Sequence, residues 1–135
     1  MPARKWLIKS EPEAYSWDDL VKDGETIWDG VRNHRAANNL RAMRKGEQAF
    51  FYHSVSDKAI VGIVEVSQPG LADPKNDMWA AVRIRPLRAL ARPVTLAEVK
   101  ADAALADVEL VRQSRLSVAE MRPAEWKHIL SLAKS

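Results

Sequence analysis

Strand-like segments fill the middle of the chain, and helix signals are confined to its two ends. Residues 48–54 are rich in aromatic side chains, residues 60–66 are β-branched and apolar on both alternating faces, and residues 80–87 alternate apolar side chains with arginine. Residues 4–9 predict one further strand at the start. A parallel doubly wound sheet needs a regular alternation of strands and helices, which this order lacks. We therefore expect an α+β fold.

Three segments carry the capping-box pattern of a helix start, a hydroxyl residue followed three positions later by an acid. They are Ser16–Asp19, Thr95–Glu98 and Ser117–Glu120. The first predicts a short helix from Trp17 to about Lys22. The other two predict helices that begin after Thr95 and after Ser117.

Composition predicts the remaining segments. Residues 36–45 are typical of a helix that ends at Gly46. Residues 67–77 contain proline, glycine and asparagine and are expected to form a loop. The last helix carries an apolar stripe at i, i+3 and i+4 that begins at Trp126.

The length of 135 residues fits one domain, expected to span residues 1–135, with enough chain to bury a hydrophobic core. The sequence has no cysteine, which excludes disulfides, thiol nucleophiles and cysteine–zinc sites. The charged start is unlike a secretory signal, and the longest apolar run, residues 59–64, is too short to cross a bilayer. We expect a soluble intracellular protein.

Positive and negative charges are segregated along the chain. Residues 30–46 and 78–97 contain arginine or lysine and no acid, whereas acids gather in residues 11–29 and 98–109. The formal net charge of +3 is small, so the distribution carries the information. One basic face would suit a phosphate backbone. The alternative is that the arginines are solvated and balanced by the acidic segments in space.

Candidates for catalysis are few. The three histidines are His34, His53 and His128, and His128 lies opposite the apolar stripe of the last helix, where we expect it to be exposed and inert. No nucleophile elbow, Walker loop or metal-ligand spacing is present. His53 and Ser54 are neighbours in a strand and point to opposite faces. Asp29 precedes a glycine and is expected to bond its own backbone. We predict a protein that is not an enzyme and needs no cofactor or metal.

Trp28 is the aromatic residue best placed for binding. Trp6, Trp17 and Trp126 fall on apolar stripes and are expected in the core, whereas Trp28 precedes an Asp-Gly turn and is followed by Arg32 and Asn33. An exposed ring could stack on a planar base while the amide reads its edge and the arginine meets a phosphate. The alternative is a Trp that plugs the end of a barrel.

Motifs along nearly the whole chain resemble one known family. They are WLIKSEP at 6–12, WDGVRN at 28–33, FYHS at 51–54, GIVEV at 62–66, RPVTLAEVK at 92–100, RQSRLSV at 112–118 and the final PAEWKHIL. In this order they resemble the EVE domain, a relative of the PUA and YTH domains. The resemblance implies a PUA-like curved β-barrel flanked by short helices. It also implies a non-catalytic reader that flips a modified base, such as 5-methylcytosine, out of DNA or RNA.

The resemblance also implies site residues. The base-pocket residues would be Ser10, Trp28, Asn33, Tyr52, His53, Ser54, Leu116 and Ser117, and the phosphate-binding residues Lys9, Arg32, Arg112, Ser114 and Arg115. Trp28 would sandwich the base with Tyr52 or Leu116. Two departures from the family pattern lie at the pocket rim, His34 in place of an aromatic residue and the short segment 67–77.

Two other functions stay open at this point. The chain could be an accessory module of PUA type that holds RNA by its backbone without a base pocket. It could also be a nucleoside-processing enzyme, for which the sequence offers no base or nucleophile. We expect a monomer that contacts no membrane, cytoplasmic in a bacterium and nuclear in a eukaryote.

Overall fold

The computed structural model describes residues 3–113 and 115–134. The strands are β1 (Lys5–Ser10), β2 (Thr26–Trp28), β3 (Gln48–His53), β4 (Ala59–Asp73), β5 (Asn76–Thr95) and β6 (Val118–Met121). The helices are α1 (Trp17–Asp23), α2 (His34–Ala42), α3 (Leu96–Ala101), α4 (Glu109–Arg112) and α5 (Pro123–Ala133), with a 3₁₀ turn at Ala103–Leu105. None of the helices in the described ranges is long and apolar enough to cross a membrane.

All six strands form one mixed sheet in the order β2-β5-β4-β3-β1-β6. The β1–β3 pair is parallel, and the other neighbours are antiparallel. This arrangement confirms the α+β prediction. The predicted barrel is not confirmed, because within the described residues β2 and β6 are the two edges and the sheet stays open between them.

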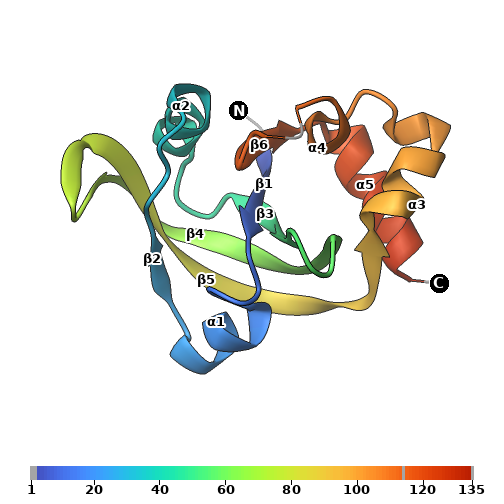
Figure 1. Cartoon of the computed structure of the whole chain (residues 1–135), viewed down its shortest axis with the longest axis horizontal. Helices are drawn as coiled ribbons and strands as arrows, with labels where there is room; N and C mark the ends of the chain where they lie inside the picture. Colours follow the sequence, from blue (N-terminus) through green and yellow to red (C-terminus); the bar gives the residue numbers. More distant parts are fainter. Residues whose placement is uncertain (1–2, 114, 135) are drawn as a thin grey trace.

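The sheet separates two hydrophobic cores. Trp6 and Phe51 pack with α1 and α2 in one core, whereas Leu7 and Phe50 pack with α3, α4 and α5 in the other. Figure 1 shows α3, α4 and α5 together on the right of the view and α2 on the left. Because successive strand residues face opposite sides, neighbours in β1 and β3 enter different cores.

Three predicted core tryptophans are confirmed. Trp6 is fully buried, and Trp17 and Trp126 keep less than a tenth of their surface exposed. Trp17 also explains a glycine in β4. A Cβ on Gly62 would lie 2.5 Å from Cη2 of Trp17, so only glycine fits under this ring.

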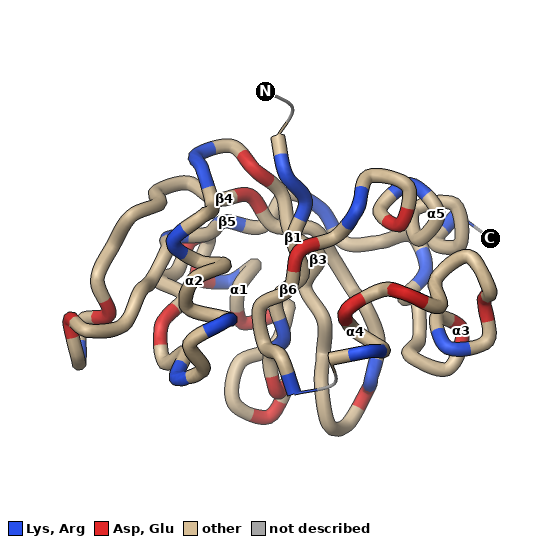
Figure 2. The backbone as a smooth tube through the Cα atoms, turned by 90° about the horizontal axis from the view of Figure 1, so that it is seen from above, with Lys and Arg blue, Asp and Glu red and all other residues tan. Residues whose placement is uncertain are grey.

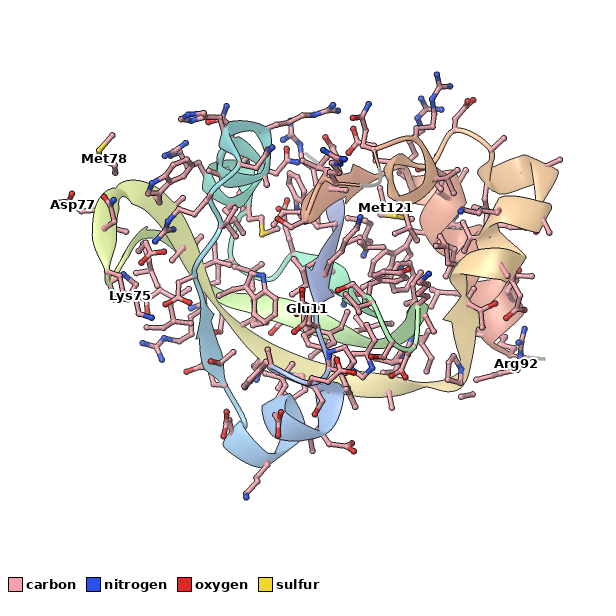
Figure 3. The ribbon with its side chains drawn as sticks, viewed as in Figure 1. Glu11, Lys75, Asp77, Met78, Arg92 and Met121 are labelled. Carbon is pink, nitrogen blue, oxygen red and sulfur yellow. The ribbon has the colours of Figure 1, made fainter. Side chains whose placement is uncertain are left out.

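The prediction of a loop at residues 67–77 is wrong. These residues belong to a long hairpin in which β4 and β5 pair as far as Asp73 and Asn76. The register shifts at several points around Gln68, and Gly70 has a left-handed φ of 71°. The turn-forming residues thus mark bulges in paired strands rather than a loop. The hairpin projects from the sheet, with Lys75, Asp77 and Met78 at its tip (Figure 3).

Two capping boxes are confirmed and one is wrong. Ser16 and Thr95 each accept a hydrogen bond from the backbone three residues ahead, at the starts of α1 and α3. The predicted helix after Ser117 is instead strand β6, in which Ala119 pairs with Leu7 of β1. Pairing with the edge of the sheet prevails here over a local helix signal. The following helix, α5, begins at Pro123.

The second helix is displaced from its prediction. It spans His34–Ala42, with Asn33 as its N-cap, rather than residues 36–45 ending at Gly46. The Asn33 side chain accepts a hydrogen bond from the backbone N–H of Ala36 at 3.0 Å. An asparagine at this position satisfies a donor that would otherwise be unpaired at the helix start.

Candidate nucleic-acid interface

A pocket of about 290 Å³ lies between the start of α2 and the segment that follows α4. Its lining residues are Asn33, Arg35, Arg112, Gln113, Arg115 and Leu116. It unites four predicted site residues from two distant motifs: Asn33 comes from WDGVRN, and Arg112, Arg115 and Leu116 come from RQSRLSV. We call it the cationic pocket. Its three arginines make it a suitable place for an anion.

Two of these arginines are paired with acids. Arg35 forms an ion pair with Glu109, which joins α2 to α4. Arg112 pairs with Asp107 at 2.8 Å, and both side chains are more than half exposed. Arg115 is exposed and has no ion pair among the described residues. Exposed pairs are weak, so a phosphate can compete for these guanidinium groups.

A second pocket, of about 270 Å³, surrounds Trp28. We call it the aromatic pocket; its lining residues are Tyr15, Thr26, Ile27, Trp28 and Asp29. The Trp28 ring meets Tyr15 edge-on at 6.2 Å and Phe51 at 5.7 Å between ring centroids. Trp28 is half-buried at the end of β2 rather than in a turn, and it packs against the α1–α2 core. It therefore supports the core and lines a pocket at the same time.

Tyr15 is fixed by its hydroxyl. This group donates to Oδ2 of Asp23 at 2.8 Å. Burial, together with this hydrogen bond, raises the pKa of Tyr15 to about 12. The phenol is therefore protonated at neutral pH and acts as a hydrogen-bond donor.

The WDGVRN segment is held in place by the β4–β5 hairpin. The buried Asp73 carboxylate accepts from Nη1 of Arg32 and from the backbone N–H of Gly30, both at 2.8 Å. The hydrogen bond from Arg32 is the largest cause that holds the pKa of Asp73 well below its usual range. The Arg32 guanidinium also lies over the ring of Trp79 at 5.5 Å, and His34 stacks on the same ring. Arg32 therefore braces the segment, although its side chain remains 42% exposed.

His53 and Ser10 are engaged in structural hydrogen bonds. Nε2 of His53 accepts from the backbone N–H of Trp17 at 3.0 Å, so its Nδ1–H donates to Asp57 at 2.7 Å. The Ser10 hydroxyl donates to the backbone carbonyl of Tyr15. Both side chains are buried and fix the segment between β1 and α1. Neither presents a free group to a base.

The predicted sandwich of Trp28 and Tyr52 is wrong. Tyr52 packs in the α3–α5 core, on the other face of the sheet from Trp28. It lines a separate pocket of about 260 Å³ together with Lys9 and Ser54. Burial raises the pKa of Tyr52 and lowers that of Lys9. Three predicted site residues thus lie apart from the aromatic and cationic pockets.

Other predicted residues have varied positions. Leu116 is buried in the α1–α2 core and reaches the cationic pocket, and the backbone carbonyl of Ser117 accepts from the N–H of Lys9 at 3.0 Å. Ser114 lies outside the described residues. His128 was expected to be exposed and inert. Its side chain is instead only 35% exposed, and its Nε2 contacts Oδ2 of Asp102 at 2.5 Å. Among the described residues no group of His, Asp and Glu could hold a metal ion.

Sequence reasoning missed Arg35, Asp73 and Trp79. Arg35 lies in the basic segment 30–46, and this charge pattern could have indicated it as a phosphate-binding residue. Asp73 and Trp79 lie at opposite sides of the hairpin turn, and the loop prediction concealed their approach to Arg32.

An open mixed sheet with helices on both faces and a cationic pocket at the start of one helix defines a small α+β binding domain. The chain belongs to the EVE domain family, whose model matches residues 4–132.

Comparisons with two relatives illustrate this membership. The NMR structure of Rpa0253 from Rhodopseudomonas palustris is 43% identical, with a TM-score of 0.93 over 98% of this chain and 94% of that chain. Human thymocyte nuclear protein 1 is 32% identical over 94% of this chain and 72% of its own length. A crystal structure of the human protein in complex with DNA containing 5-methylcytosine has a TM-score of 0.90 and 30% identity, and covers 98% of this chain and 99% of that chain.

Proposed function

We propose that this chain is a single EVE domain, residues 1–135, that reads 5-methylcytosine or a related modified base in DNA without catalysing a reaction. The observation that carries this proposal is the course of the WDGVRN segment. It begins at Trp28 in the aromatic pocket and ends at Asn33 in the cationic pocket. One short segment thus links a place for a base to a place for its phosphates.

The aromatic pocket would receive the flipped base. Trp28 supplies a stacking surface, worth about 1–3 kcal/mol per base. The Tyr15 hydroxyl oxygen, whose hydrogen is donated to Asp23, and the exposed Asp29 carboxylate offer hydrogen-bond acceptors beside it. A cytosine presents an amino donor, which a carboxylate can accept. Flipping costs a few kcal/mol, so single strands and weakly paired sites are expected to bind more readily.

The cationic pocket would hold the phosphates next to the flipped base. Arg112 and Arg115 are exposed, and Asn33 keeps its amide N–H₂ as a donor because its oxygen caps α2. Phosphate contacts of this kind fix the position of a nucleic acid without reading its sequence. They also make the affinity depend on salt.

The similarity to human thymocyte nuclear protein 1, whose structure contains 5-methylcytosine DNA, supports DNA over RNA as the partner. Burying one methyl group contributes only about 0.8 kcal/mol. We therefore expect a methylated site to bind about fourfold more tightly than an unmethylated one, unless a further polar contact adds to this difference.

The test is a binding titration with fluorescent oligonucleotides that carry cytosine, 5-methylcytosine or 5-hydroxymethylcytosine at one position. Trp28→Ala should weaken binding about 5- to 150-fold, because it removes a stacking interaction of about 1–3 kcal/mol. Trp28→Phe keeps an aromatic ring and should retain part of the affinity. Equal binding of all three oligonucleotides would refute a base reader.

Trp28 also packs on Phe51, so a second variant is needed that leaves the core intact. Arg112→Ala/Arg115→Ala changes two exposed side chains and should weaken binding to modified and unmodified DNA by the same factor. If Trp28→Ala instead leaves the affinity for all three oligonucleotides unchanged, the chain holds the backbone only. That result would favour an accessory module of PUA type.

A further inference from the structure

The proposed function leaves one large cavity without a role. It has a volume of about 510 Å³ and lies at the end of α2, whereas the cationic pocket lies at its start. Its charged side chains are Arg4, Arg41, Arg44, Lys45 and Glu47. We call the four basic residues the α2-end cluster. Figure 2 shows Lys and Arg along α2 and on the turn that follows it.

The single acid of this cavity, Glu47, offsets only one of the four positive charges of the cluster. Glu47 is buried and uses its carboxylate on the indole N–H of Trp6 and the backbone N–H groups of Arg4 and Arg44. These three donors are uncharged. The carboxylate is therefore engaged by neutral groups, and the guanidinium and ammonium groups around it are left to face the cavity.

The basic side chains have few acidic partners. Arg41, Arg44 and Lys45 form no ion pair within residues 3–113 and 115–134, and Arg4 has a loose contact of 3.6 Å with Glu120. Arg41 is nevertheless positioned, because its guanidinium donates to Asn38 at 2.8 Å and to the carbonyl of Met78 at 3.0 Å. The cluster is thus a positive surface, with four basic side chains against one carboxylate in the cavity.

Its distance from the cationic pocket matches a stretch of duplex. Helix α2 has 9 residues, so its two ends are about 14 Å apart at roughly 1.5 Å per residue. A duplex rises about 3.4 Å per base pair, so the two sites are separated by about four base pairs. One DNA backbone could therefore contact both ends of the helix.

We propose that the α2-end cluster binds phosphates of the DNA backbone about four base pairs away from the base that is read. This inference rests on the proposed function, since it takes DNA as the partner. The cluster increases the affinity for any sequence, whereas the aromatic pocket at Trp28 decides which base is preferred.

The experiment measures affinity against salt for wild type and for Arg44→Ala/Lys45→Ala. Both residues are exposed, and the backbone bond of Arg44 to Glu47 is kept. The matched control is Arg88→Ala/Lys100→Ala, which removes two exposed positive charges from β5 and α3. Each protein is titrated with methylated and unmethylated duplexes that extend either about three or about ten base pairs on both sides of the central cytosine.

On the long duplex we expect the log–log salt slope of Arg44→Ala/Lys45→Ala to fall by about 1.8, since each phosphate contact contributes about 0.9. This corresponds to a loss of about 60-fold at 0.1 M salt if the salt-dependent part vanishes at 1 M. The control variant should lose much less affinity. On the short duplex, the cluster variant should bind with the affinity of the wild type. The ratio of methylated to unmethylated affinity should be unchanged.

An equal loss of affinity in the cluster variant and in the control would overturn the inference, because the change in net charge would then explain both results. An unchanged slope would overturn it as well. A wild type without methyl preference would instead refute the proposed function, and the slopes on the long duplex would still decide the role of the cluster.

Discussion

Glu47→Ala should destabilise the protein strongly, because one buried carboxylate satisfies three donors. Its Oε1 accepts from the indole N–H of Trp6 at 2.8 Å and from the backbone N–H of Arg44 at 2.9 Å, and its Oε2 accepts from the backbone N–H of Arg4 at 2.9 Å. Trp6 is fully buried, so after the substitution its indole N–H would have no water to replace the lost acceptor.

The expected loss is about 3–5 kcal/mol, since a hydrogen bond to a charged group contributes about 1.5–3 kcal/mol and two of the three donors lie close enough to the surface to bind water instead. A domain of this size has a total stability of about 5–15 kcal/mol. The melting temperature should therefore fall by about 10–15 °C, at roughly 3 °C per kcal/mol. Glu47→Gln keeps one acceptor oxygen and should cost about half as much.

The effect should depend on pH. Burial raises the pKa of Glu47. The hydrogen bonds from Arg4, Trp6 and Arg44 lower this pKa by more than burial raises it, so the net shift is downward. A carboxyl whose pKa is lower in the folded state stabilises the protein above its unfolded pKa of about 4.3, and this contribution is lost as the pH falls through the folded value. The difference in the free energy of unfolding between wild type and Glu47→Gln should thus become smaller below about pH 4.

Urea unfolding followed by tryptophan fluorescence measures these free energies. The matched control is Glu65→Ala, which removes an acid from an ion pair with the half-exposed Arg85 and should cost less than about 1 kcal/mol. If Glu47→Ala is no more destabilising than this control, the three hydrogen bonds do not stabilise the fold as argued.

Two further predictions concern packing and positioning. Gly62→Ala should cost about 1–3 kcal/mol, because its Cβ would lie 2.5 Å from Cη2 of Trp17; a partial recovery in Gly62→Ala/Trp17→Leu, measured by urea unfolding, would identify this clash as the cause. Asp73→Asn should weaken binding of methylated DNA several-fold while the protein stays folded, because Arg32 loses its charged partner and the WDGVRN segment loses its brace; an unchanged affinity in the same titration would show that the brace has no part in binding.

The sequence predicts correctly those helices whose start depends only on neighbouring residues. The capping boxes at Ser16 and Thr95 depend on residues three positions apart, and both begin helices as expected. The capping-box pattern at Ser117 is equally good locally. This segment nevertheless forms a strand, because it pairs with β1, which lies more than a hundred residues earlier in the chain. A local pattern contains no information about such a partner.

Several residues of the cationic pocket could be named from the sequence, but their arrangement could not. Both motifs of the cationic pocket were identified, and Asn33, Arg112, Arg115 and Leu116 meet there. Tyr52 was assigned to the same site as Trp28, although the alternation of side chains in β3 sends it to the opposite face.

Carboxylates distinguish two kinds of arginine on this small protein. Arg32 is paired with the buried Asp73, and Arg35 is paired with Glu109, so these two cations first of all hold elements together. The Arg115 and Arg44 side chains form no ion pair within the described residues, and both residues are exposed to solvent. A basic segment in the sequence therefore mixes positioning residues with binding residues, and only the placement of the acids separates them. For this reason the modest net charge of +3 is compatible with a strongly positive surface at both ends of α2.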